Sequence, residues 1–378
     1  MLCKMTSEER RKGRYARRQA KRAEKKADRM NGHDDFGAVF SYRNLYHSYR
    51  CCRRGVSWKA SVQRYIATAP MSIAQTRHRL MNGTYKSPGF YEFDLYERGK
   101  HRHIRSTVIG ERVVQRCLCD NALVPALMPT MIYDNGASMK GKGYDFCMRR
   151  LVCHLQRHYR KYGQEGYILL FDFSRFFDNV SHALVKGIFE KTFSDVRIRK
   201  LAGHFVDAFG DVGLGLGSQI SQVLALSSAN RLDHAIKEVM RIHGYARYMD
   251  DGYLIHPSKA HLKKCLKMIA EICGELGITL NRKKTQLVKL SHGFTWLKAR
   301  VYLARTGKVI RKICKQSIVR TRRRMKRLKK KLDAGRLQFR DIYNSWQSWK
   351  GYAQKFHAWR TLQSMSGLYL KLFIEGVW

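Results

Sequence analysis

Three aspartates stand in segments that are otherwise apolar. Asp172 interrupts the run 169–173, and Asp250 and Asp251 lie between the apolar and aromatic residues of 245–255. A buried carboxylate is costly unless a cation neutralises it, so each segment predicts either an Arg or Lys partner or a divalent metal ion. Together, the carboxylates could converge on two Mg²⁺ ions. Such a pair would clamp the attacking and leaving oxygens of an in-line phosphoryl displacement.

The surrounding segments predict the elements that position these aspartates. Residues 167–173 form a short, nearly all-apolar run, which indicates a buried central strand. Residues 245–248 and 253–255 are typical of a hairpin with Asp250 and Asp251 at its turn. A strand end beside such a turn would bring the three carboxylates together.

Further segments predict a second hairpin and several helices. Residues 91–96 and 101–108 indicate paired strands, with Lys100, Arg102 and Arg105 on or near the tip. A strand–turn–strand unit is expected over 278–290. Helices are expected over 111–123 (with Pro125 ending or kinking the helix), from 181, and over 218–242, 260–276 and 345–359. Trp346, Trp349 and Phe356 in the last of these favour a packed core.

The charge of the chain is extreme. Its 378 residues include 74 Lys and Arg against 29 Asp and Glu, a formal net charge of +45. So much like charge indicates a polyanionic partner. The first thirty residues carry twelve basic and four acidic side chains in a helix-compatible pattern, which predicts either a solvated tail or an arm that contacts phosphates.

A second basic segment lies near the carboxyl end. Residues 308–331 contain thirteen Lys and Arg and no acid, with apolar residues at helical spacing, so a basic amphipathic helix is expected. Its candidate nucleic-acid contacts are Arg320, Arg322, Arg323, Arg324, Lys326 and Arg327.

Several function classes are disfavoured. The ten cysteines show no metal-site spacing, which favours reduced, mostly buried thiols. No apolar run is long enough to span a bilayer, and the charged N-terminus has no secretory signal, so neither a membrane partner nor export is expected. The expected location is the cytoplasm.

The aspartates belong to an ordered series of motifs that resembles that of reverse transcriptases. Segment 171–178 (FDFSRFFD) looks like motif A of that family, and 248–251 (YMDD) looks like motif C. The others are similar to a fingers motif of bacterial members at 99–104 with 111–115, motif B at 213–222, motif D at 276–285 and motif E at 293–297. The resemblance is collinear from about residue 91 to 300.

Motif B narrows the resemblance. Leu216-Gly217 and Ser221-Gln222 replace the usual Gln-Gly and Ser-Pro, which is similar to the reverse transcriptases of diversity-generating retroelements. The segment 345–352 looks like the end of their thumb. Two departures stand out: Gly215 occupies a position where proline is usual, and 297–299 (LKA) replaces Leu-Gly-Tyr in motif E.

The resemblance implies catalytic and metal-binding roles. Asp172 and Asp250 would ligate two Mg²⁺ ions, with Mn²⁺ a possible substitute. Asp251 would support them, and the carbonyl of Phe173 would be a further ligand. Lys284 would either protonate the departing pyrophosphate or contact phosphate as a solvated cation.

It also implies nucleotide contacts. Lys100 and Arg102 would hold the triphosphate. Phe177 would collide with a ribose 2′-hydroxyl, although an ordinary core phenylalanine is the alternative. Leu216 and Gly217 would lie beside the incoming base.

The expected fold is α+β, a right-hand polymerase. We expect a basic N-terminal arm over 1–45, fingers over 46–165, a palm with an antiparallel sheet over 166–305, and a basic helical thumb over 306–378. The arm and the basic helix would grip template RNA and the hybrid through their phosphates.

The expected function is RNA-directed DNA synthesis from an RNA template, a DNA primer or cDNA, and dNTPs. The resemblance implies a bacterial or phage-encoded retroelement enzyme that copies a template-repeat RNA into mutagenised cDNA. It would act with a structured retroelement RNA and a small basic accessory protein.

Two alternatives remain open. One is another bacterial or phage reverse transcriptase of the retron, group II intron or phage-defence type, although the residues after motif E are too few for an added endonuclease or large maturase domain. The other is a non-catalytic RNA-binding protein on a polymerase scaffold, which would not need costly clustered acids.

Overall fold

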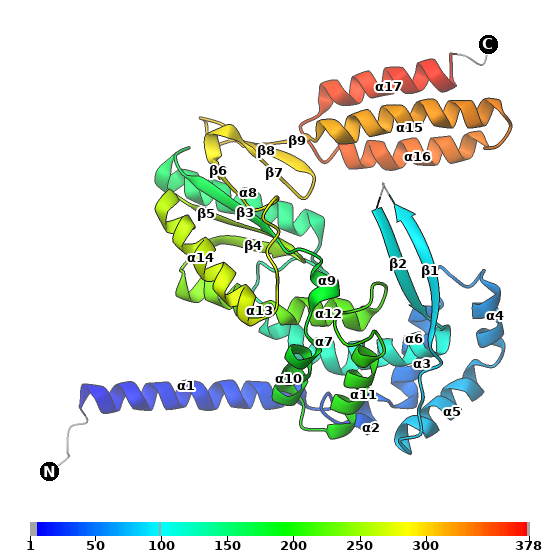
Figure 1. The fold of residues 1–378 in the computed structure, drawn as a ribbon, viewed down its shortest axis with the longest axis vertical. Coiled ribbons are helices and arrows are strands. Elements are labelled where there is room, and N and C mark those ends of the chain that lie inside the picture. Colours follow the sequence, from blue (N-terminus) through cyan, green and yellow to red (C-terminus); the bar gives the residue numbers. More distant parts are fainter. Residues whose placement is uncertain (1–5, 98–99, 376–378) are drawn as a thin grey trace.

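The largest sheet of the described residues has four antiparallel strands (Figure 1). The computed structural model describes residues 6–97 and 100–375. The strand order is β4-β5-β3-β6. The strands are β3 (Tyr167–Asp172), β4 (Gly244–Tyr248), β5 (Asp251–His256) and β6 (Gln286–Lys289). The predicted central strand and its hairpin are therefore confirmed.

The two faces of this sheet are covered by different helices. Leu169 and Phe171 of β3 pack in one core with residues of α14 (Lys259–Glu275). Ile168 and Leu170 point the other way, into a second core with residues of α8 (Tyr144–Tyr162). Because successive strand residues alternate between faces, an all-apolar strand requires cover on both sides.

A long hairpin and two groups of short helices lie outside the four-stranded sheet. The hairpin consists of β1 (Phe90–Glu97) and β2 (Lys100–Thr107) and points toward the C-terminal helices (Figure 1). The amino-terminal helices are α2 (Phe36–Val39), α3 (Tyr42–Cys52), α4 (Ala60–Ala67) and α5 (Ala69–Met81). The remaining helices are α9 (Phe176–Asn179), α10 (His182–Thr192), α11 (Val196–Asp207), α12 (Gln219–Ser228), α13 (Asn230–His234) and the π-turn η3 (Ala235–Val239).

The helix expected over 111–123 does not end at Pro125. It begins as α6 (Ile109–Leu118), widens into a π-turn η1 (Cys119–Leu123), and continues as α7 (Val124–Leu127) and the short 3₁₀ turn η2 (Met128–Thr130). The π-turn directly before Pro125 accounts for proline in a continuing helix, because proline in a regular α-helix lacks the N–H and clashes with the preceding turn.

The carboxyl-terminal part consists of a small sheet and three helices. The sheet is β7 (Phe294–Trp296), β8 (Ala299–Leu303) and β9 (Val309–Ile313), preceded by the turn η4 (Leu290–His292). The helices are α15 (Lys315–Asp333), α16 (Phe339–Ala353) and α17 (Trp359–Phe373). The basic helix thus begins at Lys315, because residues 309–313 pair with β8 instead.

The three helices share a small core. Trp346 of α16 is buried and stacks on Trp349 and on Tyr369 of α17, so the aromatic residues pack as core, as expected. Phe356 lies beyond the end of α16 and packs against the second core of the sheet.

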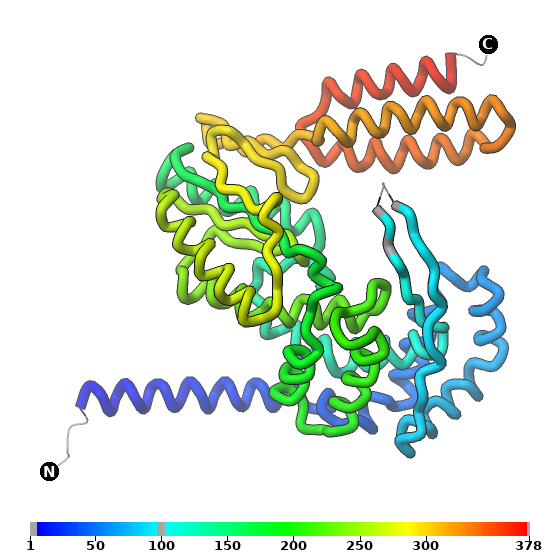
Figure 2. The backbone as a smooth tube through the Cα atoms, in the orientation of Figure 1, coloured from blue at the N-terminus to red at the C-terminus, as the bar shows by residue number. Residues whose placement is uncertain are grey.

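Helix α1 (Ser7–Met30) projects away from the rest of the molecule (Figures 1 and 2). A capping box between Thr6 and Glu9 begins it, and Met30 is its buried residue. The described residues contain no helix long and apolar enough to cross a lipid bilayer. Each cysteine in the described part of the chain is free, and most are buried.

Candidate active site

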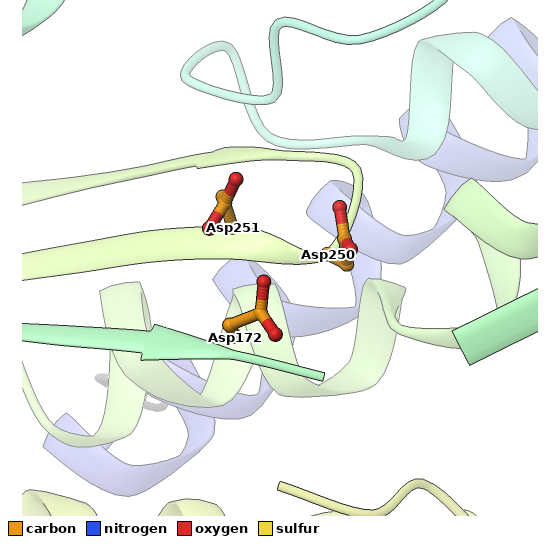
Figure 3. A group of neighbouring side chains, drawn as sticks. All are labelled: Asp172, Asp250 and Asp251. Carbon is orange, nitrogen blue, oxygen red and sulfur yellow. The ribbon is translucent and has the colours of Figure 1, made fainter. Parts of the chain in front are cut away.

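The three aspartates meet at one end of the central sheet (Figure 3). Asp172 ends β3, Asp251 begins β5, and the two residues are directly paired in the antiparallel register. Asp250 precedes Asp251 in the turn after β4. One carboxylate oxygen from each residue lies within 4.8 Å of the others.

A strained turn presents Asp250 and Asp251. Met249 has φ 58°, a left-handed conformation that is uncommon for a side chain of this size. The N–H of Phe173 donates to the carbonyl of Asp250 at 3.1 Å, which ties the turn to the strand that carries Asp172. Gly252 is required at its position because a Cβ there would overlap the ring of Phe171 on the paired strand.

The carboxylate of Asp172 accepts hydrogen bonds from two side chains. It is buried, and Asn281 Nδ2 donates to its Oδ1 at 3.1 Å while Lys284 Nζ donates to its Oδ2 at 2.7 Å. The Asn281 N–H also donates to the Asp172 backbone carbonyl at 2.8 Å. Sequence reasoning missed Asn281, although its spacing of three residues before Lys284 could have suggested a shared loop.

The surroundings of Asp251 disfavour its ionised form, unlike the donors around Asp172. Burial, followed by repulsion from Asp250 and Asp172, raises the pKa of Asp251 to about 7. A cluster of carboxylates that repel one another favours a divalent cation, and oxygen ligands are those that Mg²⁺ and Mn²⁺ accept. The donor set therefore fits the expected metal ions.

Lys284 is a cation that contacts this cluster. Its side chain is 55% exposed, so it reaches the carboxylates from the solvent side. Partial burial opposes protonation, but the contact with Asp172 outweighs it and raises the pKa of Lys284. Lys284 is thus held as an ammonium group beside the site.

The motif B loop packs against motif A. The N–H of Leu214 donates to the carbonyl of Phe177 at 2.6 Å. Phe177 lies half-buried in α9, directly after the strand of Asp172. Leu216 is half-buried and Gly217 is exposed beside β2.

Gly215 has a local steric reason. A Cβ at this position would overlap the ring of Phe209, so the proline that is usual in related sequences would not fit this packing. Lys100 and Arg102 belong to β2, but their side chains lie outside the described residues.

A pocket of about 780 Å³ opens beside Asp250 and Asp251. One wall is the hairpin of β7 and β8, whose two turn residues, Leu297 and Lys298, have φ of 44° and 63°. This is a tight two-residue hairpin turn built without glycine. The motif E hairpin is therefore formed despite the Leu-Lys-Ala sequence.

The six candidate nucleic-acid contacts of α15 are all exposed, but they face different ways. Four of them line an open groove of about 1000 Å³ along the helix: Arg320, Arg323, Lys326 and Arg327. Arg322 instead donates to Ser364 Oγ of α17 at 3.1 Å, and Arg324 lies beside the aromatic core near Trp346.

The chain was compared with known proteins. The sequence profile described as "Reverse transcriptase (RNA-dependent DNA polymerase)" matches residues 97–319. No curated protein matches the chain by sequence.

The solved structures that the chain matches include the apo telomerase of Candida tropicalis, with 13% identity, a TM-score of 0.46, and coverage of 65% of this chain and 53% of that one. The telomerase of Candida albicans in complex with a telomeric RNA fragment has 11% identity, a TM-score of 0.48, and coverage of 79% and 62%. The chain therefore spans 53 to 62% of the length of these two structures. The profile match covers more than half of the chain, and the protein belongs to the reverse transcriptase family.

Proposed function

We propose that this protein is an RNA-directed DNA polymerase whose nucleotidyl transfer takes place at Asp172, Asp250 and Asp251. The observation that carries the proposal is the convergence of these carboxylates from β3 and from the β4–β5 turn, beside an accessible pocket. A protein that only binds RNA would gain nothing from three mutually repelling acids, since they weaken attraction to phosphate.

The chain's own groups divide the work. Asp172, Asp250 and the Phe173 carbonyl would hold two Mg²⁺ ions, with Asp251 in support. Bound Mg²⁺ would supply Lewis-acid stabilisation of the attacking and leaving oxygens. Lys284 would donate a proton to a departing phosphate oxygen or contact it as a cation, and its charged ammonium group beside Asp172 supports either role.

Other residues would select and orient the nucleotide. Lys100 and Arg102 would neutralise the triphosphate. Phe177 would exclude a ribose 2′-hydroxyl by steric overlap. Leu216 and Gly217 would lie against the incoming base without a side-chain hydrogen bond.

We propose that the chain consists of four parts, several of which bind nucleic acid. The proposed division is an arm over 1–45, fingers over 46–165, a palm over 166–305 and a thumb over 306–378. The groove along α15 would follow the phosphates of the template–primer hybrid, because its lining is cationic and contains no acid.

The carboxylate site is tested by primer extension. The variant D250N/D251N should lose dNTP incorporation on a primed RNA template by several orders of magnitude, because its turn can no longer hold cations. D333N, which alters an exposed aspartate of α15, is the matched control and should retain activity. Unchanged incorporation by D250N/D251N would refute the site.

A narrower role is part of the proposal. Leu216-Gly217 and Ser221-Gln222 support a diversity-generating retroelement enzyme, bacterial or phage-encoded and cytoplasmic. It would act with a structured RNA and a small basic accessory protein. Sequencing of cDNA made on an adenine-rich template tests it: errors concentrated opposite adenine are expected, and uniformly low error would leave only the broad polymerase function.

A further inference from the structure

A fully buried ion pair lies directly behind the turn that carries Asp250 and Asp251. Arg247 is in β4 and Asp233 is in α13, and both side chains have 0% exposure. Arg247 Nε and Nη2 donate to the two Asp233 oxygens at 2.8 and 2.6 Å. This is a bidentate contact, which fixes the direction of the guanidinium plane.

The same guanidinium also holds the backbone of the turn. Arg247 Nη1 donates to the carbonyl of Met249 at 2.7 Å, and Nη2 donates to the carbonyl of Leu226 in α12 at 3.2 Å. Met249 is the residue with φ 58°. Strained backbone of this kind persists only where its surroundings over-determine it.

Further hydrogen bonds hold both members of the pair. Asp233 also accepts from Tyr245 Oη at 2.5 Å and from Asn135 Nδ2 at 3.4 Å. The Arg247 N–H donates to the Asp134 carbonyl at 3.2 Å, and the Arg247 carbonyl accepts from Gly136 at 3.0 Å. Side chain and backbone of Arg247 are therefore fixed from separate segments of the chain.

Stability alone is a weak reason for such a pair. Replacing a buried ion pair by apolar residues of similar volume is often neutral or stabilising, because two charges no longer have to be desolvated. What an apolar replacement cannot supply here is the N–H donor to the Met249 carbonyl. The buried ion pair therefore has a role that apolar residues could not fill, which is to fix the conformation of the turn at Met249.

We propose that Arg247 and Asp233 are positioning residues, which hold the Met249–Asp251 turn so that its two carboxylates face the metal ions. The proposal rests on the metal site of the proposed function. Arginine is needed because its rigid fork reaches Asp233 and the turn carbonyl at once. A lysine ammonium is a single point on a flexible chain.

The test is the paired variant R247M/D233L, measured without nucleic acid and then in primer extension. Mn²⁺ binding followed by electron paramagnetic resonance should weaken by about tenfold or more, as for other losses of groups that orient metal ligands. The kcat should fall similarly, while KM for primer–template stays near wild type. Melting should remain cooperative but at a lower temperature, because the Met249 and Leu226 carbonyls and the donors of Tyr245 and Asn135 lose their partners. Wild-type Mn²⁺ affinity and kcat in the folded variant would overturn the proposal.

Two further variants separate positioning from folding. Y245F removes one donor to Asp233 but leaves the contact between Arg247 and the Met249 carbonyl, so its Mn²⁺ affinity should match wild type. R247K keeps a positive charge opposite Asp233 but cannot reach the Met249 carbonyl at the same time, so its Mn²⁺ affinity should also fall. It is used for the Mn²⁺ measurement if R247M/D233L does not melt cooperatively. Loss of cooperative melting in both would assign Arg247 a folding role and refute the proposal.

The Mn²⁺ measurement also separates this inference from the proposed function. Arg247-dependent Mn²⁺ binding in a wild-type protein that extends no primer would refute the polymerase and keep the positioning role. Robust extension with Mn²⁺ affinity independent of Arg247 would do the reverse.

Discussion

Asp251 and Asp172 are paired in one register but held in opposite ways. Asp172 receives donors from Asn281 and Lys284, whereas burial and two neighbouring carboxylates raise the pKa of Asp251 to about 7. An acid whose pKa is raised in the folded state destabilises the fold once it is ionised. Without a bound cation, Asp251 therefore reduces the stability of the protein that it serves.

This imbalance predicts the behaviour of D251N in EDTA. When the pKa of an acid is higher in the folded than in the unfolded state, the protein becomes less stable as the pH rises. The loss begins near the unfolded pKa of about 4 and continues through the folded pKa. D251N should therefore melt at a higher temperature than wild type at pH 8, and the difference should shrink toward pH 5. Differential scanning calorimetry measures both.

Added Mg²⁺ supplies the complementary check. A cation that binds only the folded state stabilises it by mass action, so Mg²⁺ should raise the melting temperature of wild type more than that of D251N. D333N should behave like wild type throughout. Identical melting of D251N and wild type in EDTA at pH 8 would contradict the repulsion argument.

Among the elements, α15 shows how one helix serves two purposes. Met325 is its buried residue and anchors it on α16 and α17, while most of its surface is cationic. Two of the arginines predicted to contact nucleic acid face the neighbouring helices, and the others line the open groove. The groove side is therefore the part of α15 expected to bind phosphates.

The triple variant R320Q/R323Q/R327Q tests the groove. Each phosphate contact releases counterions, so three lost contacts should weaken primer–template binding and lower the slope of log K against log salt by about two to three. The melting temperature should be unchanged because all three side chains are exposed. Fluorescence anisotropy over a salt series gives both quantities.

The matched control lies on α14. K263Q/K264Q/K267Q removes the same charge from exposed positions of α14, which packs on one face of the four-stranded sheet and lies far from α15 (Figure 1). It should leave the salt slope near the wild-type value. Equal losses in both triple variants would mean that net charge, rather than the groove, determines binding.

At the scale of the whole molecule, helix α1 stands out by its positive charge and its exposure. Helix α1 extends from the body, is exposed along nearly all its length, and contributes eleven Lys and Arg against four acids. Its length is about 36 Å at 1.5 Å per residue. We therefore expect this long cationic rod to attract polyanions that the rest of the chain does not reach.

The arm is tested with R10Q/R14Q/R17Q/R18Q/K21Q, which keeps good helix formers at each position. Affinity for a long structured RNA should fall, whereas extension of a short primer–template should stay at wild-type rates, because α1 lies away from the sheet that carries the aspartates (Figure 2). Binding and extension assays on the same preparations separate the two. A matching loss on the short substrate would contradict an accessory role.

Local patterns in the chain predicted the central strand, the YMDD hairpin, the hairpin over 91–108 and the basic helix, because period and turn residues act over a few positions. They also identified the three aspartates as one candidate site. The same reasoning ended one helix at 123, although it continues past Pro125, and began the basic helix too early. A π-turn and a strand pairing override local preference at these two places.

Packing between distant segments decided the rest. Lys284 and Asn281 contact Asp172 across more than a hundred residues of sequence. Arg247 of β4 pairs with Asp233 because α13 packs against the sheet. Whether an arginine of α15 faces solvent or a neighbouring helix depends on how three helices assemble. Contacts of this kind depend on which elements become neighbours, and this information is not carried by the spacing of residues within any one element.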